Sequence, residues 1–213
     1  MKKVLFLTVL FAAGITCKSF AQFSMSLGPL LGMNYNFYHG AAIDNANVSY
    51  NGAGFSVGAQ ADMKFSPVLG MLITVNAFDA LNAKASVTQQ NVKNVRAFKL
   101  AYLTIDPAMK FSVPGTGLGF FAGPGIGFKL QGKNEQYQIE GGQRTQLQAK
   151  TDLMNTLIRV NGQIGMSYDF DLKTMFLTPY FLFDYGFTNV QESIEYNASG
   201  IKFGLVLKFS VTN

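Results

Sequence analysis

The sequence predicts an all-β protein: an eight-stranded antiparallel transmembrane up-and-down β-barrel that follows an N-terminal signal peptide. Three observations predict this fold, namely a low content of charge, apolar residues at alternate positions, and connections sorted by length. The chain has 213 residues, of which 48% are hydrophobic and 14% charged, whereas soluble domains carry about 25% charged residues. This balance excludes a disordered chain, and the single cysteine excludes a disulfide scaffold or a cysteine-based zinc module.

Residues 1–21 have the pattern of a secretory signal peptide. Lys2 and Lys3 precede an apolar run over residues 4–15, and Ser19 and Ala21 place small side chains at −3 and −1 of a cleavage site. The run is shorter than the roughly 20 residues of a membrane-spanning helix. We therefore expect cleavage after Ala21, with Cys17 lost in the leader and residues 22–213 forming one barrel domain.

The net charge of +5 comes mostly from this leader. Without Lys2, Lys3 and Lys18 the chain keeps 14 basic residues against 12 acidic ones, a formal charge of +2. The mature protein therefore lacks the strong basicity that a nucleic-acid partner would favour, and we expect none.

Alternation of apolar with small or polar residues identifies each strand in order. From Phe23 to Tyr35 the odd positions are apolar, while most even ones are serine, glycine or asparagine, as a strand with two different faces requires. The same pattern recurs seven times, and each segment has around the 9 to 11 residues with which a tilted strand crosses a bilayer. The predicted strands are 23–35, 55–65, 69–78, 101–111, 118–130, 158–170, 177–188 and 201–211.

The connections separate a membrane barrel from a soluble one. Residues 38–53, 79–98, 132–156 and 189–199 form long polar connections, whereas 66–67, 113–116 and 171–174 form tight turns. Long loops at one end and short periplasmic turns at the other are typical of outer-membrane barrels. The expected location is the cell outer membrane, with its lipid as the first partner. Pro124 and Pro179 fall inside strands, and we expect them near strand ends or at bulges.

Three short segments resemble the strand motifs of the PorT-like outer-membrane β-barrel protein family. They are YLTIDPAMKF at residues 102–111, FAGPGIG at 121–127 and YGFTNV at 185–190, and GIKFGLVLKF at 200–209 is similar to that family's closing strand. The resemblance extends over residues 22–211. It implies an eight-stranded barrel in the outer membrane, in a family of which some members are associated with protein secretion and gliding machinery.

The predicted inward face collects ten charged residues, six basic and four acidic. An eight-stranded barrel has room inside only for side chains or one small ligand, and charges buried together must pair or be solvated. We expect a structural polar network that plugs the lumen, with a selective channel as the alternative. Its members are Asp62, Lys64, Asp106, Lys110, Lys129, Arg159, Asp169, Asp184, Lys202 and Lys208.

No motif in the sequence predicts catalysis, a metal site or a cofactor. The glycines of residues 115–127 lack the spacing of a phosphate-binding loop, so they are expected to leave room for bulky lumen side chains or to let the strand bend. His39 is the only histidine, with Asp44 close in sequence, and no serine is marked out as a nucleophile. The expectation is a protein that is not an enzyme.

The long loops are the expected place of specific function. The segment 131–152 carries Lys133, Glu135, Glu140, Arg144, Lys150 and Asp152, which suits either a partner site or a solvated, mobile loop. Near the loops, Tyr35, Phe37, Tyr38, Phe55 and Phe98 are expected to form an aromatic girdle.

These features predict a membrane anchor that displays extracellular loops, as a structural protein or within an envelope or secretion-associated assembly whose protein partners contact the loops. A small-solute pore and a periplasmic lipocalin-like carrier are the alternatives.

Overall fold

The computed structural model describes residues 23–40, 49–89, 92–152, 157–191 and 194–211, and these form one continuous antiparallel β-sheet. The predicted signal peptide and its cleavage site lie outside the described residues. Within the described residues no helix has the length and hydropathy of a membrane-spanning helix.

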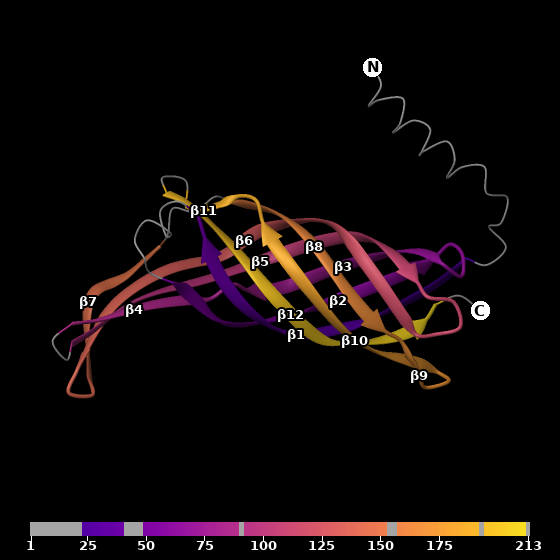
Figure 1. Ribbon diagram of the computed structural model, residues 1–213, viewed down its shortest axis with the longest axis horizontal. Helices are drawn as coiled ribbons and strands as arrows, with labels where there is room; N and C mark the ends of the chain where they lie inside the picture. Colours follow the sequence, from indigo (N-terminus) through magenta and orange to yellow (C-terminus); the bar gives the residue numbers. More distant parts are fainter. Residues whose placement is uncertain (1–22, 41–48, 90–91, 153–156, 192–193, 212–213) are drawn as a thin grey trace, which may run out of the picture.

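Eight long strands close into a ring, which confirms the predicted architecture (Figure 1). Each strand pairs antiparallel with its two neighbours, and the ring closes because β1 pairs with β2 on one side and with β12 on the other. In order around the ring the strands are β1 (Ser24–His39), β2 (Tyr50–Lys64), β3 (Leu69–Ala80), β5 (Val92–Ser112), β6 (Leu118–Glu140), β8 (Ile158–Tyr168), β10 (Met175–Gly186) and β12 (Ile194–Ser210).

Two of the predicted long loops are β-hairpins. β4 (Ala83–Gln89) pairs along its whole length with the start of β5, and β7 (Gln143–Asp152) pairs with the extended end of β6. The interpretation of 131–152 as a mobile loop is therefore wrong in its local structure. Both hairpins prolong the barrel wall beyond the ring (Figure 1). Their strands lack strict apolar alternation because, beyond the bilayer, neither face has to meet lipid.

The tight turns gather at the opposite end of the barrel, where β1 begins and β12 ends (Figure 1). Ser66 accepts a hydrogen bond from the N–H of Leu69, and Gly115 supplies the positive φ that the 113–117 turn requires. β9 (Phe170–Asp171) and Met175 flank the third turn. We call this the turn end and the other the hairpin end; the predicted sorting of connections is confirmed.

The apolar face of each strand points outward. Leu31, Ile164 and Leu205 expose 63%, 62% and 51% of their surface, whereas their inward neighbours Leu30 and Val206 are buried. An apolar exterior around a polar interior suits a barrel surrounded by lipid. It is the reverse of what a lipocalin-like carrier requires.

The prolines of the wall lie where a hydrogen-bonded ladder is interrupted. The ladder between β5 and β6 stops at Ile105 and Ile126 and resumes at Met109 and Ala122, so Pro107 and Pro124 face each other in the gap. Neither proline has an N–H to donate, so the same interruption of the β5–β6 ladder accommodates both residues. The prediction that Pro124 lies at a strand end or bulge is therefore wrong.

Pro179 fits its expectation better. β8 pairs with β10 from Tyr180 onward, so Pro179 lies just beyond the end of that ladder while it still pairs with Leu205 of β12.

Aromatic side chains form outward groups at both ends of the barrel. At the hairpin end Phe37 stacks on Phe183 and Phe55 on Phe78, with ring centroids 6.2 and 5.2 Å apart. At the turn end Phe23 stacks on Phe65, and Tyr168 contacts Phe170. Such girdles are characteristic of transmembrane barrels. Tyr35, Phe37 and Phe55 are in the predicted place, whereas the placement of Tyr38 and Phe98 in the girdle is wrong, because both are buried inside the barrel.

Replacing Ile164 with arginine is expected to impair membrane insertion. The side chain faces lipid near the middle of β8, where a cation costs about 2–4 kcal/mol close to the bilayer midplane. The measurement is the yield of the heat-modifiable folded form in vesicles. Gln143→Arg, at the start of β7 in the hairpin, adds the same charge outside the ring and should insert normally; equal yields from both variants would contradict a lipid-facing position for Ile164.

Candidate functional site

The lumen at the turn end is filled by a compact cluster of charges, which we call the lower cluster. Asp62 accepts hydrogen bonds from Lys110 and Lys208 at 2.6 and 2.8 Å, and Asp169 accepts from the same lysines at 3.1 and 2.7 Å. Lys64, which is partly exposed, approaches Asp169 at 3.8 Å. The two carboxylates balance the charge of the two buried lysines. The cluster crosses the lumen, because its members come from three strands, β2, β5 and β12, and from the β8–β9 turn.

Asp169 anchors the cluster from that turn. Its backbone N–H donates to Gly117 and Thr178 donates to its carboxylate, which ties two turns to β10. Lys208 and Lys110 both donate to this carboxylate, so they compensate the charge that burial alone would disfavour.

A second cluster, the upper cluster, lies nearer the hairpin end. Lys202 contacts Asp79 at 2.7 Å and Asp184 at 2.9 Å, and Arg159 donates to Asp184 at 2.9 Å and to the carbonyl of Ala198 at 3.0 Å. Asn34 adds a hydrogen bond to Asp79. Three of these charged residues were predicted for the lumen, and the structure brings them together.

Asp79 was missed by the sequence analysis, which placed it at the start of a loop. A β-bulge between Asn76 and Asp79 inserts one extra residue into β3 and reverses which face the following residues occupy. Phe78 therefore packs outward on Phe55, and Asp79 points inward. The adjacent apolar pair Ala77 and Phe78, which breaks the alternation, is the sequence signal of this bulge.

The remaining predicted lumen residues occupy separate positions. Asp106 is buried between the two clusters, where it accepts hydrogen bonds from Thr104 and Asn76 and lies more than 4 Å from any cationic group of the described residues. Lys129 is half-buried on the inward face of β6 and does not join either cluster.

Apolar side chains fill the lumen between the clusters. The members of this apolar layer are Leu30, Leu72, Ala108, Phe121, Tyr180, Leu182 and Val206. The cavity that reaches from this layer to Asp106 and Lys202 has a volume of only about 20 Å³, room for one water molecule.

The glycines of β6 make space for these lumen side chains, as the sequence analysis expected. A Cβ on Gly125 would collide with Asp106 and Asn161, and one on Gly119 would lie 2.6 Å from Cε of Lys110. These glycines therefore contribute to the packing of the lumen, because their missing side chains leave room for those of the neighbouring strands.

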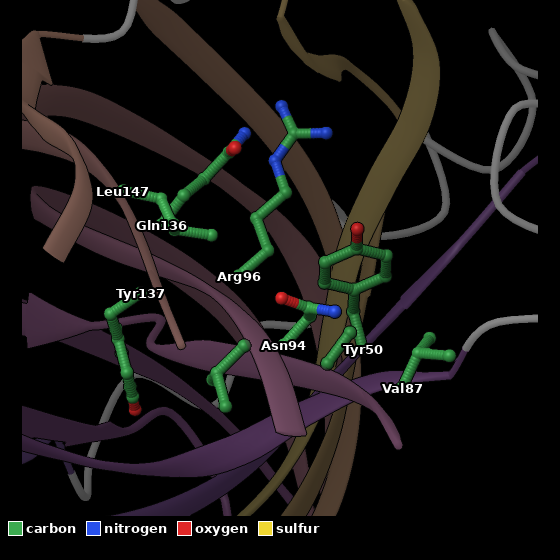
Figure 2. A pocket seen from close by; sticks show the side chains of 9 residues that line it. Tyr50, Val87, Asn94, Arg96, Gln136, Tyr137 and Leu147 are labelled. Atoms are coloured by element: carbon green, nitrogen blue, oxygen red, sulfur yellow. The ribbon is translucent and has the colours of Figure 1, made fainter. Parts of the chain in front are cut away.

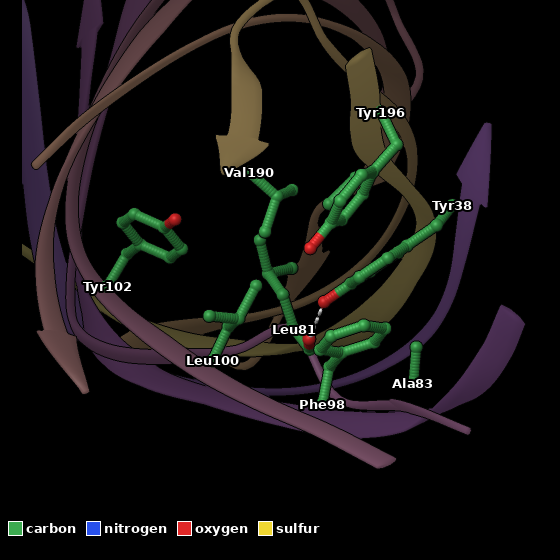
Figure 3. Close-up of a cluster of buried hydrophobic side chains, with 9 residues drawn as sticks. Tyr38, Leu81, Ala83, Phe98, Leu100, Tyr102, Val190 and Tyr196 are labelled. Carbon is green, nitrogen blue, oxygen red and sulfur yellow. Dashed lines mark hydrogen bonds between the residues drawn. The ribbon is translucent and has the colours of Figure 1, made fainter. Parts of the chain in front are cut away.

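An aromatic layer, which we call the cap, closes the lumen at the hairpin end (Figure 3). The rings of Tyr38, Phe98 and Tyr196 lie 5.8 Å from one another between centroids, and the Tyr38 hydroxyl donates to the carbonyl of Leu81 at 2.7 Å. Leu81 and Leu100 pack beneath them. The lumen is thereby obstructed at three levels: the lower cluster, the apolar layer with the upper cluster, and the cap.

His39 ends β1 at the outer face of the hairpin end. Its Nε2 lies 2.7 Å from Oγ of Ser199, and its ring stacks on Tyr185 with centroids 4.9 Å apart. Ser199 also accepts the N–H of Gly186 and has no exposed surface, so a substrate could not reach its hydroxyl. Asp44 lies outside the described residues.

Glu135 of the β6–β7 hairpin forms ion pairs with one residue of β5 and one of β7. Glu135 is buried between Lys99 and Arg144, at 3.1 and 3.3 Å, and Arg144 also stacks on Tyr137 at 3.8 Å. Lys133 pairs across the ladder with Lys99, and Glu140 begins the exposed hairpin tip. Lys150 and Asp152 lie on β7. The part of the chain that the structure describes contains no cluster of acidic, histidine or cysteine side chains suited to a metal ion.

A pocket of about 200 Å³ lies at the foot of the hairpins, next to the cap (Figure 2). Strands β2, β4, β5, β6 and β7 contribute to it. Its lining residues are Tyr50, Ala85, Val87, Asn94, Val95, Arg96, Gln136, Tyr137 and Leu147. The sequence analysis did not identify this pocket, because its polar members carry no motif and come together only through the hairpin pairing.

The comparison with protein families agrees with this architecture. Residues 20–192 match the family described as outer membrane protein beta-barrel domain. Among solved structures, Ail of Yersinia pestis, in complex with the heparin analogue sucrose octasulfate, is 8% identical with a TM-score of 0.46 over 87% of this chain and 99% of that chain. Neisserial surface protein A is 12% identical with a TM-score of 0.43, over 86% and 96% of the two chains. No curated protein matches the sequence significantly. The chain resides in the outer membrane and belongs to the family of outer membrane proteins with this beta-barrel domain.

Proposed function

We propose that the protein is a non-conducting, non-enzymatic barrel that anchors in the outer membrane and displays its two long β-hairpins to the outside. The observation that carries this proposal is the obstruction of the lumen at three levels by paired charges, apolar side chains and the cap. By the rule that short turns face the periplasm, the hairpin end lies outside the cell. A rigid wall that holds long hairpins is suited to present a binding surface.

Within the family, we propose a PorT-like protein that takes part in an envelope or secretion-associated assembly through its hairpins. Support comes from the strand motifs at residues 102–111, 121–127 and 185–190 and from the closing strand at 200–209. Cleavage after Ala21 belongs to this proposal, and the mass of the N-terminal peptide of the purified protein tests it.

Conductance in planar bilayers tests the closed barrel. The purified full chain, once its insertion is verified by heat-modifiable migration, should give no steady open channel, because the lower cluster and the cap leave no continuous passage. An outer-membrane porin in the same bilayer serves as the positive control. Stable, repeated current steps from the wild-type protein would instead establish the alternative, a small-solute pore.

A further inference from the structure

The pocket at the foot of the hairpins contains Arg96, which contacts no carboxylate of the described residues. Arg144 and Arg159, the other two arginines of the chain, each contact a carboxylate. The guanidinium of Arg96 lies over the ring of Phe98 at 5.0 Å and has no hydrogen bond or salt bridge with any described residue. Its Nε is buried without a hydrogen-bond partner, an arrangement that is costly unless an acceptor is supplied from outside the chain.

The surroundings of Arg96 are suited to an anion. Gln136 lies directly opposite Arg96 in the β5–β6 ladder, and in Figure 2 the two side chains rise on the same side of the ribbon, with Tyr50 nearby. On the β4 side Arg96 faces Ala85, whose small side chain leaves space beside the guanidinium. The pocket lining contains no acidic residue, so nothing within it competes with an incoming anion.

The charge of the hairpins also favours an anion. Residues 83–99 and 131–152 together contain seven basic and three acidic residues, although the mature chain as a whole is close to neutral. A local excess of positive charge at an open mouth attracts anionic solutes and speeds their association.

The apolar part of the lining and the size of the pocket restrict the class of ligand that would fit. Val87, Leu147 and the Tyr50 ring provide apolar contact beside the polar groups. A volume of about 200 Å³ lies below the usual 300 to 1,000 Å³ of ligand sites, so the ligand is small. We propose that this pocket binds a small organic carboxylate, with Arg96 receiving the carboxylate, Gln136 and Asn94 offering neutral donors, and the apolar side chains covering the body of the ligand.

Binding of benzoate to the full-length mature protein in detergent micelles, measured by titration calorimetry, tests this site. We expect saturable binding that is about tenfold or more tighter than that of benzamide, the neutral isostere, because a charge-assisted hydrogen bond to a guanidinium distinguishes the two. Arg96→Gln should weaken benzoate binding by a similar factor. Lys99→Gln, which removes one positive charge from the same strand at a residue that does not line the pocket, should leave it unchanged.

Four results would overturn the proposal: no saturable binding of benzoate, equal binding of benzamide, unaltered binding by Arg96→Gln, or an equal loss with Lys99→Gln. Inorganic phosphate that binds as tightly as benzoate would overturn the carboxylate class, since the apolar lining would then contribute nothing. Heat-modifiable migration verifies that each variant is folded. The two proposals fail separately. If the barrel conducts but still binds benzoate through Arg96, the closed lumen is refuted and the carboxylate site stands.

Discussion

Replacing Asp62 with asparagine is expected to lower the free energy of unfolding by about 3–5 kcal/mol, the usual cost of removing one partner from a buried ion pair. Asp62 accepts from both Lys110 and Lys208, and all three side chains are almost completely inaccessible. The amide leaves two buried ammonium groups with Asp169 as their nearest carboxylate. Urea titration of the protein folded in lipid vesicles measures the change.

A second substitution separates charge imbalance from loss of packing. Asp62→Asn combined with Lys208→Met leaves Lys110 paired with Asp169, so the double variant should recover a large part of the stability. Lys99→Met provides the matched control, because Lys99 is 46% exposed and Glu135 keeps Arg144, and its cost should stay below about 1 kcal/mol. Equal destabilisation by Asp62→Asn and Lys99→Met would show that the lower cluster is not the buried network described above.

Replacing Phe98 with alanine in the otherwise wild-type protein is expected to lower the free energy of unfolding by about 3–5 kcal/mol, the usual cost of removing a buried phenyl ring. Phe98 contacts Tyr38, Tyr196 and Tyr50 at the centre of the cap. Because the ring wall is paired independently of the cap, the loss should appear first as faster amide hydrogen exchange in β4 and the start of β5.

The control for the cap is a phenylalanine of the outer surface. Phe187 is 60% exposed, so Phe187→Ala removes an equal ring that is not enclosed by the protein, and exchange in the β4–β5 hairpin should remain slow. If Phe98→Ala left that exchange as slow as in the wild type, the cap would not be what holds the hairpin to the barrel.

The ring and most of its inward face were predictable from the sequence because one physical rule governs them. Where one side of a strand meets lipid and the other the lumen, alternation is strict, so Leu205 and Lys202 could be assigned to opposite faces. Outside the bilayer that rule no longer applies. The β6–β7 hairpin is a regular strand pair whose glutamines suggested a loop, and Tyr38 and Phe98 point inward although aromatic residues near a barrel rim favour the interface.

The candidate site required information that alternation does not contain. Which lysine meets which carboxylate depends on strand tilt, and Asp62 and Lys208 are 146 residues apart. The position of Asp79 depends on a bulge, and the Arg96 pocket depends on two hairpins whose pairing has no sequence motif. The positions of Pro107 and Pro124 could not be predicted for a similar reason. Each proline alone is unfavourable in a strand, and the sequence does not show that the two face each other across one interruption of the β5–β6 ladder.

Because of the bulge in β3, the charge inside the lumen depends on the number of residues in that strand. A single extra residue turns Asp79 toward Lys202; without it, the same carboxylate would face the aromatic girdle and Lys202 would keep only Asp184 within reach. A one-residue deletion at Ala77 would thus change the charge of the lumen without altering any charged residue. A gap or an insertion within a strand of such a barrel therefore changes which of the following side chains line the interior.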